Sequence, residues 1–117
     1  MRVNQMIKDE SELQGIVIDM AQSRGWLVKP ASQGSKQGGV PRRATQNKTS
    51  NGYPDLTLAK NGIVLFFELK MDGEQLSAPQ LRWSAHLPAS YVIRPADLAD
   101  DRVQRILEQH DESTSIA

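Results

Sequence analysis

PDLTLAKNGIVLFFELK, residues 54–70, is the stretch of sequence that decides the fold. Two apolar runs, Pro54 to Ala59 and Ile63 to Leu69, are separated by Lys60-Asn61-Gly62. An Asn-Gly pair between two such runs is a strong signal for a tight hairpin turn, because both residues tolerate positive φ angles. The stretch therefore predicts two antiparallel strands that are joined at Asn61-Gly62.

Charged side chains interrupt the second of these strands at alternate positions. Glu68 and Lys70 lie two residues apart, so alternation along the strand places both on the same face. Asp55 opens the partner strand, where the hairpin register places it opposite Glu68. Facing carboxylates repel each other unless a cation or a shared proton lies between them, and Mg²⁺ is typically held by one or two carboxylates. We therefore expect a site for Mg²⁺ or Mn²⁺ beside Lys70, whose charge can orient a water or stabilise a phosphate.

A purely structural role also accounts for these residues when the pattern is taken alone. Glu68 and Lys70 can form an ordinary ion pair at the end of a strand, and Asp55 can be a turn residue after Pro54. The short pattern is common by chance. The rest of the chain has to distinguish the two interpretations.

Upstream of the hairpin, the sequence predicts a helix over residues 9–24. Asp9 is a candidate N-cap, and Glu12 completes a capping-box pattern three residues later. Apolar residues then recur at helical spacing. These residues are Leu13, Ile16, Val17, Met20 and Ala21. A short strand is expected at residues 26–28, stopped by Pro30.

Residues 30–52 are predicted to form a long basic surface loop. No Asp or Glu occurs between Trp26 and Tyr53, and loops of this length in a compact domain are usually functional or disordered. The side chains expected to contact DNA phosphates are Lys36, Arg42, Arg43 and Lys48. A solvated linker or a dimer contact is the alternative. Tyr53 can stack on a base, or it can be buried beside the hairpin.

Downstream of the hairpin, Ser77 is a candidate cap for a helix that runs to about Leu87 with Pro79 in its first turn. Trp83 and Leu87 are expected in the core of the protein. A strand at residues 91–93 follows.

A last helix is predicted over residues 96–109, followed by a flexible tail at 110–117. The element order αβββαβα then predicts an α/β fold with a central mixed sheet flanked by helices. All of it belongs to one domain, residues 1–117.

This combination resembles the PD-(D/E)XK nuclease superfamily. Pro54-Asp55 and the Glu-Leu-Lys of residues 68–70 match the superfamily motif at the usual separation and in the usual hairpin. Within the superfamily the chain is most similar to the VRR-NUC domain of the type found alone in phages and bacteria, because Gly52 precedes Pro54-Asp55 and Gln80 follows the hairpin. The resemblance covers most of residues 9–107.

The resemblance also implies roles for individual residues. Asp55, Glu68 and the backbone carbonyl of Leu69 would bind the metal, and Lys70 would position the attacking water. Glu12 would contact the metal or a water ligand, a role that can coexist with helix capping.

Gln80 would be a hydrogen-bonding partner of the site lysine or of a substrate phosphate. A solvated residue in the first turn of its helix is the alternative for Gln80.

The activity implied by the resemblance is that of a Mg²⁺- or Mn²⁺-dependent DNA endonuclease. Branched DNA, such as a Holliday junction or a flap, is the expected substrate. A homodimer would place two sites symmetrically on a junction. The alternatives are a non-catalytic DNA-binding or assembly module that keeps the nuclease fold, and a small-molecule phosphodiesterase.

Composition limits the number of domains, the kinds of site and the cellular location that the chain can have. A chain of 117 residues suits a single domain, and the lack of cysteine excludes disulfides and thiolate metal sites. The N-terminal residues lack the apolar core of a signal peptide, and no stretch approaches the roughly 20 apolar residues that span a bilayer. We expect a cytoplasmic protein that does not contact a membrane.

Overall fold

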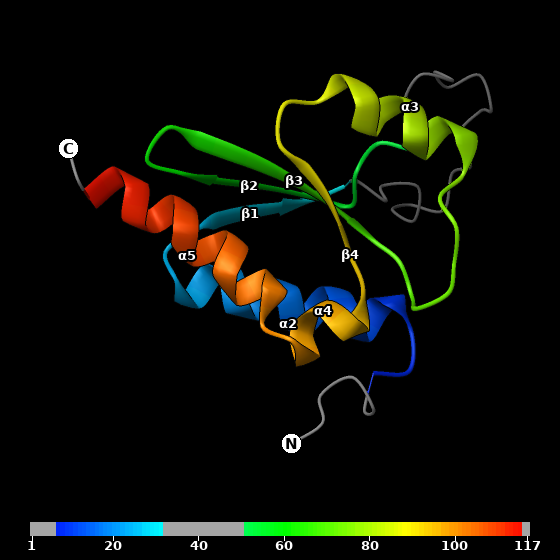
Figure 1. Ribbon diagram of the computed structural model, residues 1–117, viewed down its shortest axis with the longest axis horizontal. Coiled ribbons are helices and arrows are strands. Elements are labelled where there is room, and N and C mark those ends of the chain that lie inside the picture. The colour runs from blue at the N-terminus through cyan, green and yellow to red at the C-terminus, as the bar shows by residue number, and fades with distance from the viewer. Residues whose placement is uncertain (1–6, 32–50, 116–117) are drawn as a thin grey trace, which may run out of the picture.

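The computed structural model describes residues 7–31 and 51–115, with side chains described up to residue 109. In Figure 1 a twisted sheet lies between α3 on one side and the group of α2, α4 and α5 on the other. The elements in chain order are α2 (Glu10–Ser23), β1 (Leu27–Pro30), β2 (Leu56–Lys60), β3 (Ile63–Leu69), α3 (Ala78–His86), β4 (Ser90–Ile93), α4 (Pro95–Ala99) and α5 (Arg102–Ser115).

The predicted hairpin is confirmed. Strands β2 and β3 pair antiparallel, and Asn61 and Gly62 between them have φ angles of 49° and 85°. Two positive φ angles in succession are what a two-residue hairpin turn with the correct twist requires. The register pairs Leu56 with Phe67, which directs Asp55, one residue earlier, toward Glu68.

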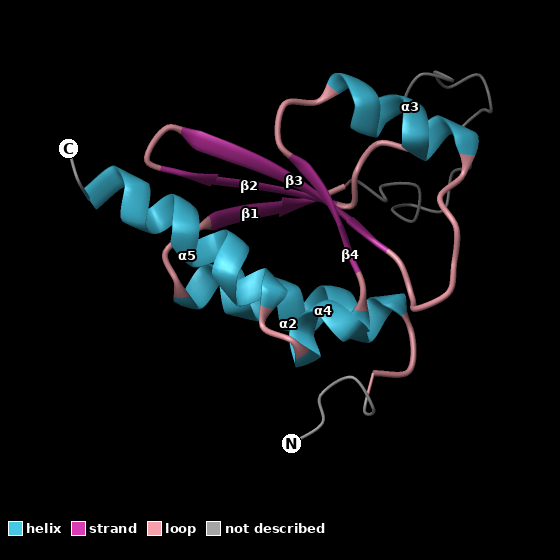
Figure 2. Ribbon diagram, in the orientation of Figure 1, coloured by secondary structure: helices cyan, strands magenta, loops and turns pink. Residues whose placement is uncertain are grey.

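The described strands form a mixed four-stranded sheet in the order β1-β2-β3-β4 (Figure 2). Strand β1 pairs antiparallel with β2, whereas β4 pairs parallel with β3. The α/β class and the mixed sheet predicted from the sequence are therefore correct. Strand β1 begins one residue later than expected and includes Pro30, which an edge strand tolerates because the missing N–H is not needed there.

The two faces of the sheet differ in composition. One face packs against α2 and α5 and carries strand residues that are fully buried together with helix residues of the same core. These residues are Leu56, Leu58, Leu65, Phe67, Leu13, Val17, Val103 and Leu107. The opposite face, called the open face below, carries the alternate strand residues. Its members are Leu27, Lys29, Ala59, Thr57, Val64, Phe66 and Glu68.

Helix α3 covers one end of the open face instead of entering the core. Ser77 caps this helix and Pro79 lies in its first turn, as predicted, but none of the side chains of α3 is buried. Trp83 and Leu87 are half-buried, so the expectation that they belong to the core is wrong. The reason is that the core lies on the other face of the sheet, out of reach of α3.

The C-terminal part differs from the single helix predicted over 96–109. It contains two helices, α4 and α5, which are separated at Asp100 and Asp101. Asp101 has a left-handed φ of 64°, and the Asp100 carboxylate accepts the backbone N–H of Arg102 at 3.0 Å. Short acidic side chains compete with helical hydrogen bonds in this way. Helix α5 then continues to Ser115, so most of the predicted tail at 110–117 is helical.

Candidate active site

The site is built on the open end of the hairpin, where Asp55 and Glu68 meet. The Asp55 Oδ2 accepts the backbone N–H of Leu69 at 2.8 Å, and the charge of Asp55 lies close enough to Glu68 to raise the pKa of that residue. The predicted juxtaposition of the two acids is therefore correct. The negative charge of Asp55 opposes ionisation of Glu68, and a cation between the two groups would relieve that repulsion.

Glu68 is the buried charged residue of the described chain, with 8% of its surface exposed. Burial, followed by the negative charge and hydrogen bond of Asp55, raises the pKa of Glu68 to about 8, against the opposing influence of Lys70. The carboxyl group of Glu68 is consequently protonated near neutral pH when no cation is bound. A cation can bind to Glu68 only if its charge stabilises the carboxylate enough to displace that proton.

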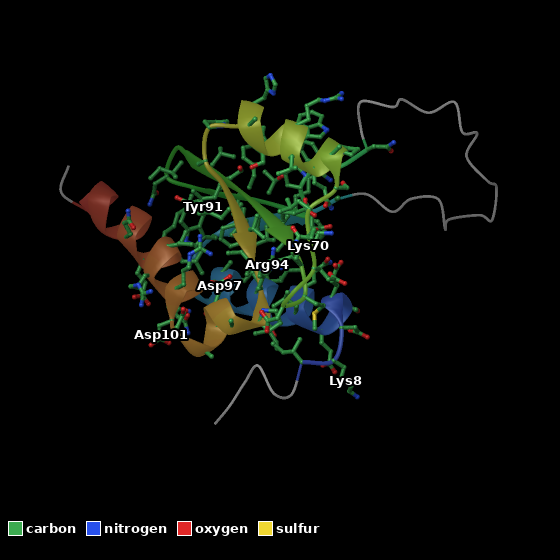
Figure 3. All side chains as sticks on the ribbon, turned by 45° about the vertical axis from the view of Figure 1, so that its right-hand side comes forward. Lys8, Lys70, Tyr91, Arg94, Asp97 and Asp101 are labelled. Atoms are coloured by element: carbon green, nitrogen blue, oxygen red, sulfur yellow. The ribbon has the colours of Figure 1, made fainter. Side chains whose placement is uncertain are left out.

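Lys70 extends β3 by one residue beyond Leu69 and remains tied to the sheet, because its backbone N–H donates to the carbonyl of Ile93 at 3.0 Å. Its ammonium group acts electrostatically on both Glu68 and Glu10. In Figure 3, Lys70 lies at the end of the sheet, between the layer of α3 and the N-terminal end of α2. The Lys70 ammonium group thus lies beside the carboxyl groups of the site, as the sequence predicts.

Gln80 joins α3 to the carboxylate pair. Its side-chain Nε2 donates to Glu68 Oε2 at 2.7 Å, while its Oε1 accepts the backbone N–H of Ser77 at 2.9 Å. The expected partners were the site lysine or a phosphate, whereas the observed partner is the carboxylate itself. One amide group therefore both completes the capping box of α3 and orients Glu68.

Gly52 places the start of α3 against the segment that leads to Asp55. Its φ is +83°, and a Cβ built there would lie 2.5 Å from the carbonyl carbon of Pro79 and 2.6 Å from the nitrogen of Gln80. Backbone approaches of this kind require glycine. The contact explains why a glycine three residues before Asp55 accompanies a glutamine at the start of the helix.

Glu12 does not have the position that the resemblance implies. Its Oε1 accepts the backbone N–H of Lys8 at 2.8 Å, and its own N–H donates to the Asp9 carboxylate. The side chain is exposed at the beginning of α2. The capping interpretation of Glu12 is therefore the one that the structure supports.

Glu10 is the acidic residue of α2 that lies near the site, and it was not among the residues predicted from the sequence. Burial, and then the charges of Asp55 and Glu74, raise the pKa of Glu10, while Lys70 lowers it. A signal was available: Glu10 precedes the buried Leu13 by three residues, which places it on the core-facing stripe of the helix. Glu12 lies about 200° further around the same helix.

Two further residues shape the site without having been predicted. Arg94 donates from Nη1 to the carbonyl oxygens of Met71 and Glu74 at 2.8 and 2.7 Å. The Glu74 side chain accepts the N–H of Met71 at 3.1 Å, and its charge contributes to the raised pKa of Glu10. Arg94 therefore holds the segment that brings Glu74 beside the carboxylates, an arrangement invisible in the sequence because β4 lies far along the chain.

A divalent ion suits the donors that are present. Within the described residues, no group of three or more His, Cys, Asp or Glu side chains has an arrangement that could hold a metal ion. Asp55 and Glu68 supply two carboxylates, the number with which Mg²⁺ is typically bound when water and phosphate complete its shell. The charge of Asp55, which raises the pKa of Glu68, is the kind of repulsion that a cation between the two groups would relieve.

The residues expected to bind DNA are only partly described. Lys36, Arg42, Arg43 and Lys48 lie outside the described residues. Tyr53 packs edge-to-face against Phe66 of β3 and is 37% exposed, so its ring is covered in part beside the hairpin.

Comparisons with family models, with curated proteins and with solved structures returned no match. In the described parts of the chain, no helix is long and apolar enough to cross a bilayer.

The raised pKa of Glu68 predicts a pH-dependent loss of stability in the metal-free protein. Between an ordinary pKa of 4.5 and the folded value of about 8, the folded protein retains a proton that the unfolded chain has released. This contribution is fully present below about pH 4.5 and is lost as the pH rises to about 8. We expect the melting temperature in EDTA to fall, relative to that of Glu68→Gln, by roughly 4 °C or more over this range. A constant difference between the two proteins would contradict the assignment.

Proposed function

We propose that the protein is a Mg²⁺- or Mn²⁺-dependent endonuclease of the VRR-NUC type that hydrolyses DNA phosphodiester bonds. The observation that carries the proposal is the buried carboxyl group of Glu68, which lies beside the carboxylate of Asp55 and the ammonium group of Lys70. Groups whose pKa values are strongly shifted by burial and by a like charge gather at catalytic sites. An ordinary surface ion pair would have neither the burial nor the second carboxylate.

Each group of the site would have its own role in hydrolysis. A bound divalent ion would supply a water of lowered pKa and neutralise charge on the phosphate. Asp55 is kept in place by the N–H of Leu69, and Glu68 is kept in place by the amide of Gln80. Lys70 can hold the attacking water and stabilise the charge that develops on the phosphate oxygens. The rigid sheet thus presents preorganised charges of both signs to one phosphate.

Branched DNA, such as a four-way junction or a flap, is the proposed substrate, and a homodimer is the proposed active form. A two-fold symmetric pair of subunits presents two identical sites, which suits the two strands that a junction offers for cleavage. The support for both statements is the resemblance of residues 52–55, 68–70 and 80 to the VRR-NUC motifs.

The test is a cleavage assay on a four-way junction, a flap and a plain duplex, each with Mg²⁺, with Mn²⁺ and with EDTA. We expect metal-stimulated cuts in at least one branched substrate and little cleavage of the duplex. Binding of DNA without cleavage in either metal would favour the non-catalytic module. The absence of both binding and cleavage would leave the small-molecule phosphodiesterase as the better hypothesis.

Lys70→Ala is expected to lower the single-turnover cleavage rate by about 10²- to 10³-fold, the effect typical of removing one preorganised charge-stabilising donor. Metal binding should persist, because the ligands proposed are carboxylates. The rise in melting temperature on adding Mn²⁺ therefore measures a property that the variant retains. Lys8→Ala removes an exposed lysine at the beginning of α2 and should cleave normally. Equal rates for the two variants would contradict the role assigned to Lys70.

A further inference from the structure

We propose that Tyr53, Trp83 and Phe66, called the aromatic platform below, bind an unstacked nucleobase next to the scissile phosphate. The inference rests on the proposed nuclease function and adds the class of substrate: DNA with an unpaired nucleotide at the cleavage point. The ring of Tyr53 contacts Trp83 edge-to-face, with centroids 4.9 Å apart, and Phe66 in the same manner at 6.3 Å. These contacts leave 37% of Tyr53 exposed.

The position of the platform links it to the carboxylates. Tyr53 precedes Asp55 by two residues, so their Cα atoms are at most about 7 Å apart. Phe66 precedes Glu68 by two residues on the same face of β3. From α3, Trp83 lies one helical turn after Gln80, the residue that binds Glu68. All three rings thus border the acidic site, within reach of a neighbouring nucleotide.

The backbone is held in place both before and after Tyr53. Gly52 fixes the backbone before it against Pro79 and Gln80, and Asp55 fixes the backbone after it through Leu69. A ring held in this way loses little conformational freedom when a base stacks on it.

Lys29 offers a phosphate contact in the same row of the open face as Phe66, with Thr57 between the two residues. Register places Lys29 opposite Thr57, whose neighbours Leu56 and Leu58 are buried in the core, so Lys29 belongs to the open face. Its side chain is exposed. Strand geometry places this pair roughly 7 Å from the position of Asp55. A strand of nucleic acid can therefore lie across the open face with its backbone at Lys29 and a base at Tyr53.

An unpaired nucleotide fits this surface better than a continuous duplex. Bases inside a duplex are stacked on both sides, so only a displaced, terminal or flipped base can present its face to an aromatic ring. Stacking on an aromatic ring does not select a particular base. The platform therefore recognises the geometry of the strand without reading its sequence, which suits a flap or a junction.

Binding is measured with Glu68→Gln as the parent protein. In this variant neither cleavage of the probe nor the presence of a metal at the site should affect the measured affinity. Fluorescence anisotropy at constant salt compares a single-stranded oligonucleotide, a flap and a plain duplex. We expect the single strand and the flap to bind about tenfold more tightly than the duplex. Tyr53→Ala should remove that preference, within the range that stacking on one ring contributes. Tyr53→Phe should retain it, and Tyr53→Leu, which keeps apolar packing without a ring, should lose it.

Two charge variants test the path of the backbone. Lys29→Gln should weaken binding to all three probes and reduce the salt dependence by about one phosphate contact. Arg105→Gln removes an exposed cation from α5, on the opposite side of the sheet, and should bind as the parent does. A 2-aminopurine base beside the flap junction should lose fluorescence on binding in a Tyr53-dependent manner.

Preference for unpaired DNA that survives in folded Tyr53→Leu would overturn the inference, as would preference for duplex in the parent. Ring-dependent binding together with a wild-type chain that cleaves nothing would instead overturn the proposed nuclease and leave the binding site standing. Cleavage together with ring-independent binding would overturn only the platform.

Discussion

Replacing Glu68 with Gln is expected to lower metal-dependent DNA cleavage by at least about 10³-fold, which corresponds to a loss of roughly 4 kcal/mol of transition-state stabilisation. The amide has nearly the same size as the carboxyl group and can still accept from Gln80, but it carries no negative charge to hold a divalent ion. Single-turnover rates on the best branched substrate, over a series of Mn²⁺ concentrations, provide the measurement.

The same variant should be at least as stable as the wild type above pH 8. Burial and the charge of Asp55 disfavour the ionised form of Glu68, and a neutral amide removes that cost. Loss of activity together with retained or increased stability is the signature of a functional charge, whereas a structural ion pair would lose stability. Rates near those of the wild type in folded Glu68→Gln would refute the proposed active site.

Gly52→Ala is expected to lower the free energy of unfolding by about 1–3 kcal/mol, because it places a Cβ on a left-handed backbone. The new atom would also approach the carbonyl oxygen of Pro79 to 2.7 Å, so the first turn of α3 must move. That turn carries Gln80, and a displacement of about 1 Å at a catalytic site can lower a rate by roughly 10²-fold. Chemical denaturation and cleavage kinetics measure the two effects separately.

Gly15→Ala is the matched control for this substitution. Gly15 lies on the exposed side of α2, and a Cβ there would meet no atom within 4 Å. Alanine in a helix interior should stabilise the protein by about 0.5–1 kcal/mol and leave cleavage unchanged. If Gly52→Ala behaved in the same way, the contact between Gly52 and α3 would have no functional role.

The sequence by itself determined the elements whose signals are local. Asn61 and Gly62 demand positive φ angles, so the hairpin, its register and the pairing of Asp55 with Glu68 could all be deduced from nearby residues. Apolar spacing likewise identified α2, and Ser77 with Pro79 identified the beginning of α3.

Tertiary structure decided which acidic residue of α2 faces the site and where α3 lies. Helical spacing separates Glu10 from Glu12, but which side of the first turn reaches Asp55 and Lys70 depends on the packing of α2 under the sheet. The clamp from Arg94 to Glu74 joins segments that are 20 residues apart and has no local signature. Electrostatic coupling and backbone contacts between distant segments depend on distance in space, which a one-dimensional pattern does not contain.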